Sequence, residues 1–72
     1  MTAYQVRMAN EYRELKERYQ KLHRMIVKYE AGTLDFEPDS PIDLLKEQRN
    51  AMHVYMTILE IRAEIESVDL GI

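Results

Sequence analysis

The feature that most constrains this chain is a regular spacing of large apolar residues over its first helix-length segment. They recur at alternating intervals of four and three positions: Met8, Tyr12, Leu15, Tyr19, Leu22, Ile26 and Tyr29. An α-helix completes a turn in about 3.6 residues, so this heptad spacing places all of them on one side. The pattern predicts a long amphipathic helix that packs against another helix.

The limits of this helix are marked by residues that favour helix ends. Thr2 is followed three positions later by Gln5, which is the spacing of a capping box. Gly32 stands where a glycine readily adopts the left-handed conformation that ends a helix. The sequence therefore predicts a first helix over about 2–31.

A second helix is expected after a loop over 32–40. Pro38 and Pro41 exclude a continuous helix. Ser40 is interpreted as the capping residue, with Pro41 at the first helical position and Asp43 near the positive end of the helix. We expect helix over about 41–67 and a tail over 68–72. The short link makes the helices antiparallel, so residues 1–72 are predicted to form one all-α helical hairpin resembling a coiled coil.

The second helix carries two seams at this spacing instead of one, and both are predominantly apolar. The first runs through Leu45, Gln48, Met52, Tyr55, Leu59 and Arg62, and the second through Ala51, Val54, Ile58, Ile61, Ile65 and Val68. One partner helix cannot cover so wide a face. We therefore expect a homo-oligomeric helical bundle, most simply a dimer, with an interface formed by Val54, Ile58, Ile61, Ile65 and Val68.

Composition gives no indication of a stabilising disulfide or metal site, or of a secreted or membrane location. The chain has no Cys and two His without zinc-site spacing, so neither a metal nor a cofactor is expected. It shows no apolar run of the length of a signal peptide or a membrane span. We expect a cytoplasmic protein of the host cell with no membrane partner.

Charge is distributed unevenly along the chain. Residues 1–31 have a net charge of +3 and residues 32–72 have a net charge of −6. The first reading is that the two halves complement each other within the hairpin. The basic run from Arg18 to Lys28 is the alternative candidate for an anionic partner. Nucleic acid is not an expected partner, because the whole chain is acidic.

No catalytic constellation is visible, and we expect a non-enzymatic protein. The chain has only two glycines, and it lacks a phosphate-binding loop and a nucleophile elbow. Glu60 and Glu64 lie near His53 and Thr57 on one predicted helix face. The Glu-x-x-His pattern of bundle metal sites is absent, so this strip is interpreted as a solvated face.

Tyrosines at core positions give the one candidate ligand site. Antiparallel pairing brings together Tyr12, Tyr19, Tyr55 and Arg62, and a cation beside aromatic faces suits a base and its phosphates. The alternative is that the tyrosine rings pack in the core while Arg62 pairs with Glu11. The residues leave both interpretations open.

Two stretches carry a resemblance to a known family. They are Tyr12 to Leu22, which reads YRELKERYQKL, and Leu44 to Arg62, which includes LLKEQ, AM and ILEIR. The pattern resembles a family of small phage proteins named after an open reading frame of a crAss-like gut bacteriophage. The resemblance implies a phage origin and a two-helix fold, and it supplies no active-site residues.

Two functions remain open at this stage. The first is a phage accessory binding protein, a counter-defence factor that sequesters a host nucleotide immune signal, such as a cyclic nucleotide, or a host protein. Small phage proteins that form oligomeric sponges supply the analogy. The second is a structural or regulatory coiled-coil adaptor with no small-molecule ligand.

Overall fold

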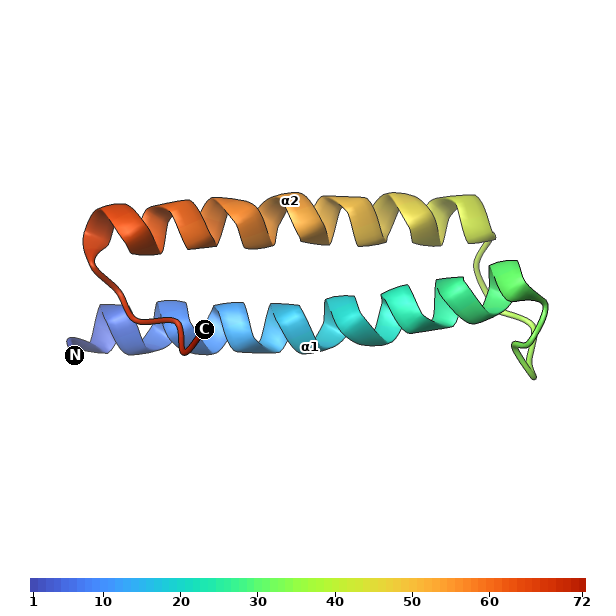
Figure 1. Ribbon diagram of the computed structural model, residues 1–72, viewed down its shortest axis with the longest axis horizontal. Helices are drawn as coiled ribbons and strands as arrows, with labels where there is room; N and C mark the ends of the chain where they lie inside the picture. The colour runs from blue at the N-terminus through green and yellow to red at the C-terminus, as the bar shows by residue number, and fades with distance from the viewer.

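The computed structural model describes all residues, 1–72, as two antiparallel helices with no strand. Helix α1 spans Ala3–Ala31 and helix α2 spans Ile42–Glu66. They lie side by side in a rod of 44 × 18 × 17 Å, with both termini at the end opposite the loop (Figure 1). The predicted all-α helical hairpin is confirmed.

Both predicted ends of α1 are confirmed. The Gln5 backbone N–H donates to Thr2 Oγ1 at 3.2 Å, and the Thr2 backbone N–H donates to Gln5 Oε1 at 3.0 Å, so the capping box is complete. Gly32 has a φ of 75° in the left-handed region, and its N–H donates to the carbonyl of Tyr29 at 3.1 Å. These bonds satisfy backbone groups that a helix end leaves without partners.

The predicted cap of α2 is wrong. Pro41 is itself the residue before the helix, with a ψ of 141°, and the Ser40 side chain makes no capping hydrogen bond. The backbone N–H groups of Leu44 and Leu45 donate to the Pro41 carbonyl at 3.1 and 3.2 Å. The helix therefore begins at Ile42, one residue after the predicted start, because the Pro41 carbonyl supplies its first acceptor.

The core of the hairpin is small. Seven residues are buried: Met8, Tyr12, Ile26, Met56, Leu59, Ala63 and Val68. The predicted heptad of α1 supplies three of them, and Leu15, Tyr19 and Leu22 are half-buried beside them. Tyr29, the last member of that heptad, is 36% exposed near the end of the helix.

The inner face of α2 differs from the predicted one by one position along much of its length. Its buried and half-buried members are Ile42, Leu45, Arg49, Met52, Met56, Leu59 and Ala63. Met56 and Ala63 replace the predicted Tyr55 and Arg62, which are exposed. Because apolar residues cover most of the circumference of α2, their periodicity alone does not define which face turns inward.

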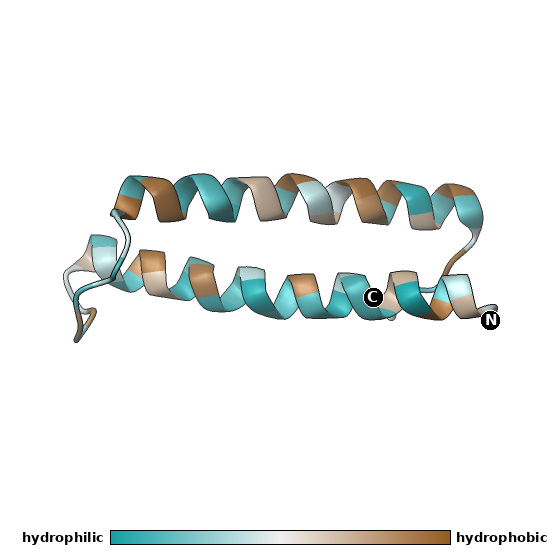
Figure 2. Cartoon of the chain, turned by 180° about the vertical axis from the view of Figure 1, so that it is seen from behind, coloured by the Kyte–Doolittle hydropathy of each residue, from teal (hydrophilic) through white to brown (hydrophobic).

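The rest of the apolar surface of α2 remains uncovered in the hairpin. We call Leu44, Ala51, Val54, Ile58, Ile61 and Ile65 the outer face of α2. Ile58, Ile61 and Ile65 are 49%, 55% and 77% exposed. At about 100° per residue this face lies roughly 150° from the inner face. Brown, hydrophobic segments accordingly recur along the whole of α2 in Figure 2.

The tail folds back over α1 instead of extending α2. Ser67 adopts the left-handed conformation, and Val68 and Leu70 then pack against the core. Val68 is 8% exposed, so it is a core residue of the hairpin and does not continue the outer face as the sequence suggested. A cavity of about 400 Å³ lies between the tail and α1. Neither helix combines the length and the apolar character needed to cross a membrane.

Candidate ligand-binding site

Tyr12, the first of the four predicted ligand residues, is part of the core. Its ring is 3% exposed, and its hydroxyl donates to Glu60 Oε2 at 2.8 Å. Burial raises the pKa of Tyr12 to about 12, and the hydrogen bond and negative charge of Glu60 add to the effect. In this conformation the Tyr12 ring presents no open face to a ligand.

Tyr19 belongs to a different group from the other tyrosines. It is half-buried and stacks on His23, with ring centroids 5.8 Å apart and planes 10° apart. His53 of α2 lies at the same centroid distance with its plane tilted by 34°. The sequence suggested that Tyr19 neighbours Tyr55, but the Tyr55 hydroxyl contacts Glu11 instead.

Tyr55 and Arg62 lie together on one flank of the hairpin. The Tyr55 hydroxyl donates to Glu11, and Arg62 Nη2 donates to the Tyr4 hydroxyl. Arg62 Nε also donates to Glu66 Oε2 at 3.2 Å. The alternative in which Arg62 pairs with Glu11 is therefore wrong, because each of these two residues has a different partner.

These contacts surround a cavity of about 250 Å³ between the two helices. Its polar lining consists of Tyr4, Arg7, Glu11 and Arg62. We call these residues, together with Tyr55, which donates to Glu11 from outside the lining, the Tyr4–Arg62 cluster. Met8 and Leu59 form the apolar lining. The sequence analysis missed Arg7, although its position three residues after Tyr4 and four before Glu11 places it on the same side of α1.

The charges of the cluster are balanced within the chain by two carboxylates. Glu11 accepts a hydrogen bond from Tyr55 and raises the pKa of that phenol, chiefly through the hydrogen bond itself. Glu66 pairs with Arg62 at the adjacent turn of α2. Arg7 takes part in no ion pair. A bound anion would therefore meet one free guanidinium and one held by a carboxylate.

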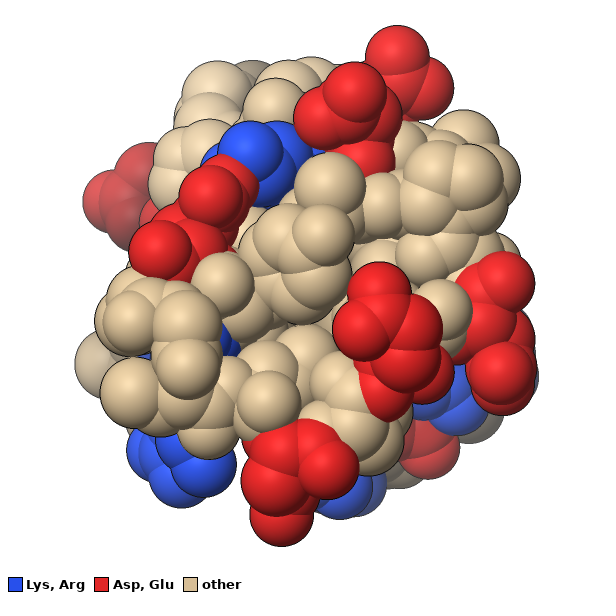
Figure 3. All heavy atoms as spheres, turned by 90° about the vertical axis from the view of Figure 1, so that its right-hand side faces the viewer, with Lys and Arg blue, Asp and Glu red and all other residues tan.

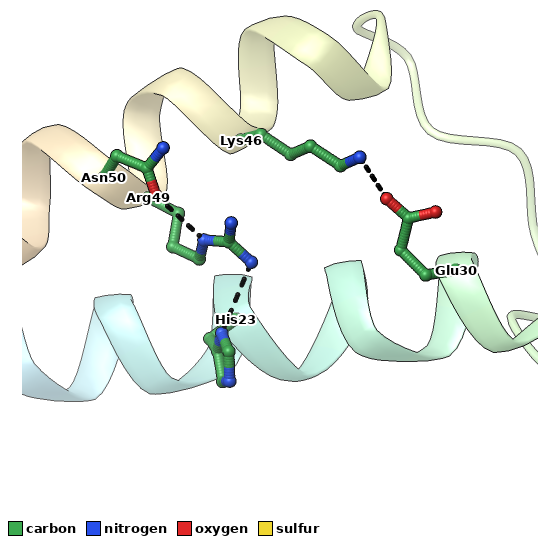
Figure 4. A network of polar contacts seen from close by, with 5 residues as sticks. All are labelled: His23, Glu30, Lys46, Arg49 and Asn50. Carbon is green, nitrogen blue, oxygen red and sulfur yellow. Dashed lines mark hydrogen bonds and ion pairs between the residues drawn. The ribbon is translucent and has the colours of Figure 1, made fainter.

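A second polar network lies near the loop end, as shown in Figure 4. Arg49 lies with Nη1 3.5 Å from His23 Nδ1, and its Nε donates to Asn50 Oδ1 at 3.3 Å. Lys46 of α2 forms an ion pair with Glu30 of α1, which is the one ion pair that joins the helices. These contacts join the two helices side by side and leave no enclosed space among them.

The chemistry available in the Tyr4–Arg62 cluster is that of binding. Phenol rings present faces for stacking, guanidinium groups bind phosphates or carboxylates, and Glu11 accepts hydrogen bonds. No group of three or more His, Cys, Asp or Glu side chains lies close enough to hold a metal ion. Together, fold and site define a small helical-hairpin protein with a polar cavity on its flank.

The comparison with protein families assigns this chain to one family. The family model described as Sequestin matches residues 2–65, which covers both helices up to the last turn of α2. The chain belongs to the Sequestin family, whose name points to a sequestering or binding role. No curated protein and no solved structure shows a match to the chain.

Proposed function

We propose that this protein binds and sequesters a nucleotide signal without chemically changing it. In this proposal it is a phage counter-defence factor that removes an immune signal, such as a cyclic nucleotide, from the host cytoplasm. The family name supports sequestration. The observation that carries the nucleotide assignment is the Tyr4–Arg62 cluster, in which one phenol and two guanidinium groups line one cavity and a second phenol, that of Tyr55, donates to Glu11 beside it.

These side chains match the parts of a nucleotide. An aromatic ring stacks on any base, and such contacts are worth about 1–3 kcal/mol each. A guanidinium group binds phosphate oxygens in a bidentate manner, which an ammonium group cannot do. The Glu11 carboxylate is an acceptor for a ribose hydroxyl or a base N–H. Tyr55 and Arg62 thus remain proposed ligand residues, joined by Tyr4, Arg7 and Glu11.

The proposal also requires that two copies of the protein associate. A cavity of about 250 Å³ is smaller than the ~300–1,000 Å³ typical of small-molecule sites, so a second copy is needed to enclose a nucleotide. The outer face of α2 supplies the contact, because its exposed isoleucines require cover from water. Tyr55 and Arg62 lie between the inner and outer faces, so a partner on the outer face borders the cluster.

The proposal is tested by thermal melting of the protein with a panel of linear and cyclic nucleotides. A nucleotide present at 100 times its Kd is expected to stabilise the protein by ~2.7 kcal/mol. Arg62→Ala should abolish that shift, and Arg62→Lys should restore little of it because bidentate contact is lost. Arg13→Ala, which changes an exposed arginine on the opposite flank, should leave the shift intact.

Two results would refute nucleotide sequestration. One is a panel in which no nucleotide shifts the melt of the wild-type protein. The other is a shift that survives both Arg62→Ala and Tyr55→Ala, which would place the ligand elsewhere. In the first case the alternative function, a structural or regulatory coiled-coil adaptor with no small-molecule ligand, becomes the leading hypothesis.

A further inference from the structure

The basic run of α1 has no acidic partner within the hairpin. Lys21, Arg24 and Lys28 are exposed and take part in no ion pair. Counting about 100° per residue, they lie on the side of α1 opposite the inward-facing Leu22 and Ile26. The sequence suggested that the two halves complement each other within the hairpin, but none of these three bases forms an ion pair with an acid of the second half.

An apolar depression adjoins these three cations. A cavity of about 240 Å³ separates α1 from the loop and is lined by Lys21, Arg24, Met25, Lys28, Leu34 and Phe36. Phe36 is 54% exposed even though Leu34 and Met25 beside it are half-buried. An aromatic ring left this exposed next to a cationic groove is a usual element of an interaction surface.

Acidic residues of the loop flank the apolar side chains of the same depression along the sequence. Asp35 and Glu37 alternate with Leu34 and Phe36 along the loop, and Asp39 follows; all three acids are exposed. Figure 3 looks at this end of the hairpin and shows acidic and basic side chains interspersed around an uncharged tan surface. The surface therefore combines the cations of α1, an apolar centre and the acids of the loop.

We propose that this loop-end surface binds the same surface of a second copy of the chain. A two-fold contact requires a self-complementary patch, in which residue i meets residue j and j meets i. A rotation about the apolar centre brings the α1 cations of one copy toward the loop acids of the other. The same rotation packs the two Phe36 rings against each other at the centre, where they are buried away from water.

Charge favours this occupant over a polyanion. A nucleic acid or an anionic membrane would gain Lys21, Arg24 and Lys28 but would also approach Asp35, Glu37 and Asp39, which repel it. A second copy supplies both signs at once. This contact is separate from the outer face of α2 and from nucleotide binding, and it doubles the size of whatever particle the outer face forms.

Two charge-reversed variants test the contact. One carries Lys21→Glu, Arg24→Glu and Lys28→Glu, and the other carries Asp35→Lys, Glu37→Lys and Asp39→Lys. All six positions are exposed, so both variants should keep the helicity of the wild type by circular dichroism. Each variant alone should have half the wild-type mass by sedimentation at the same concentration. An equimolar mixture should recover the wild-type mass, because opposite charges again face each other.

Three further arms make the outcome decisive. Arg13→Glu with Lys16→Glu, a reversal on the same helix away from the loop, should keep the wild-type mass. Salt of about 1 M, where the Debye length is ~3 Å, should weaken the association of the wild type. The proposal is overturned if both variants keep the wild-type mass or if their mixture does not recover it. It is also overturned if the wild type binds a labelled oligonucleotide through these three cations.

Discussion

At the scale of the residue, Tyr12 shows how this core accommodates a polar group. A phenol is an unusual choice for a core position, because its hydroxyl needs a hydrogen-bond partner when water is excluded. Glu60, an exposed residue of α2, supplies that partner across the edge of the core. The buried ring thereby keeps its apolar contacts and leaves no polar atom unsatisfied.

The raised pKa of Tyr12 predicts a loss of stability at alkaline pH. The folded state holds the proton more tightly than the unfolded chain, whose phenol has a pKa near 10.0. The stability that depends on a buried, protonated Tyr12 phenol bonded to Glu60 is therefore complete below pH 10 and is lost as the pH rises toward about 12. Tyr12→Phe should show a shallower decrease of the unfolding free energy over this interval than the wild type. Parallel slopes in urea titrations of the two proteins would contradict the assignment.

The N-termini of the two helices predict different effects on stability when the residue in the predicted capping position is replaced by alanine. Thr2→Ala removes a capping bond and should cost ~1 kcal/mol, a decrease in Tm of roughly 4–8 °C for a domain of this size. Ser40→Ala removes no capping bond and should leave the melting temperature unchanged. Calorimetry of both variants at one protein concentration checks the pair. An equal loss in both would restore Ser40 as the cap of α2.

At the scale of the element, the sequence was enough to predict both helices and, for α1, the residues at which the helix begins and ends. A heptad in α1 leaves one apolar stripe, so the inward face of that helix is unambiguous. The rotation of α2 was not predictable, because Met56 and Tyr55, or Ala63 and Arg62, are neighbours on a nearly continuous apolar surface. The contacts of Arg62 with Tyr4 and Glu66 follow from that rotation, which is why the sequence could not predict the cluster either.

The outer face of α2 predicts a change of mass on a single substitution. Ile61→Glu should dissociate the oligomer, because a carboxylate would be buried without a partner in the proposed interface. Thr57→Glu places the same charge on the exposed polar strip of α2 and serves as the matched control. Sedimentation at micromolar concentration should show a smaller particle for Ile61→Glu only. Equal masses for the wild type and both variants would contradict an interface on this face.

At the scale of the whole molecule, the hairpin has more apolar surface than it can bury. Seven buried residues are a small core for a chain of 72 residues, and small domains without disulfides or metals commonly gain stability by association. Two separate surfaces are available for it, the outer face of α2 and the loop-end surface. The Tyr4–Arg62 cluster borders the first of them, so assembly and ligand capture are coupled in this account.

Sequestration itself is tested most directly by following the ligand. The protein in excess is mixed with the nucleotide that best stabilises it, the free ligand is separated by ultrafiltration, and the protein fraction is then denatured by heat. We predict that the nucleotide disappears from the filtrate and is recovered from the denatured protein with its mass and chromatographic retention unchanged. A nucleotide that stays in the filtrate, or one released as a different compound, would contradict capture without chemistry.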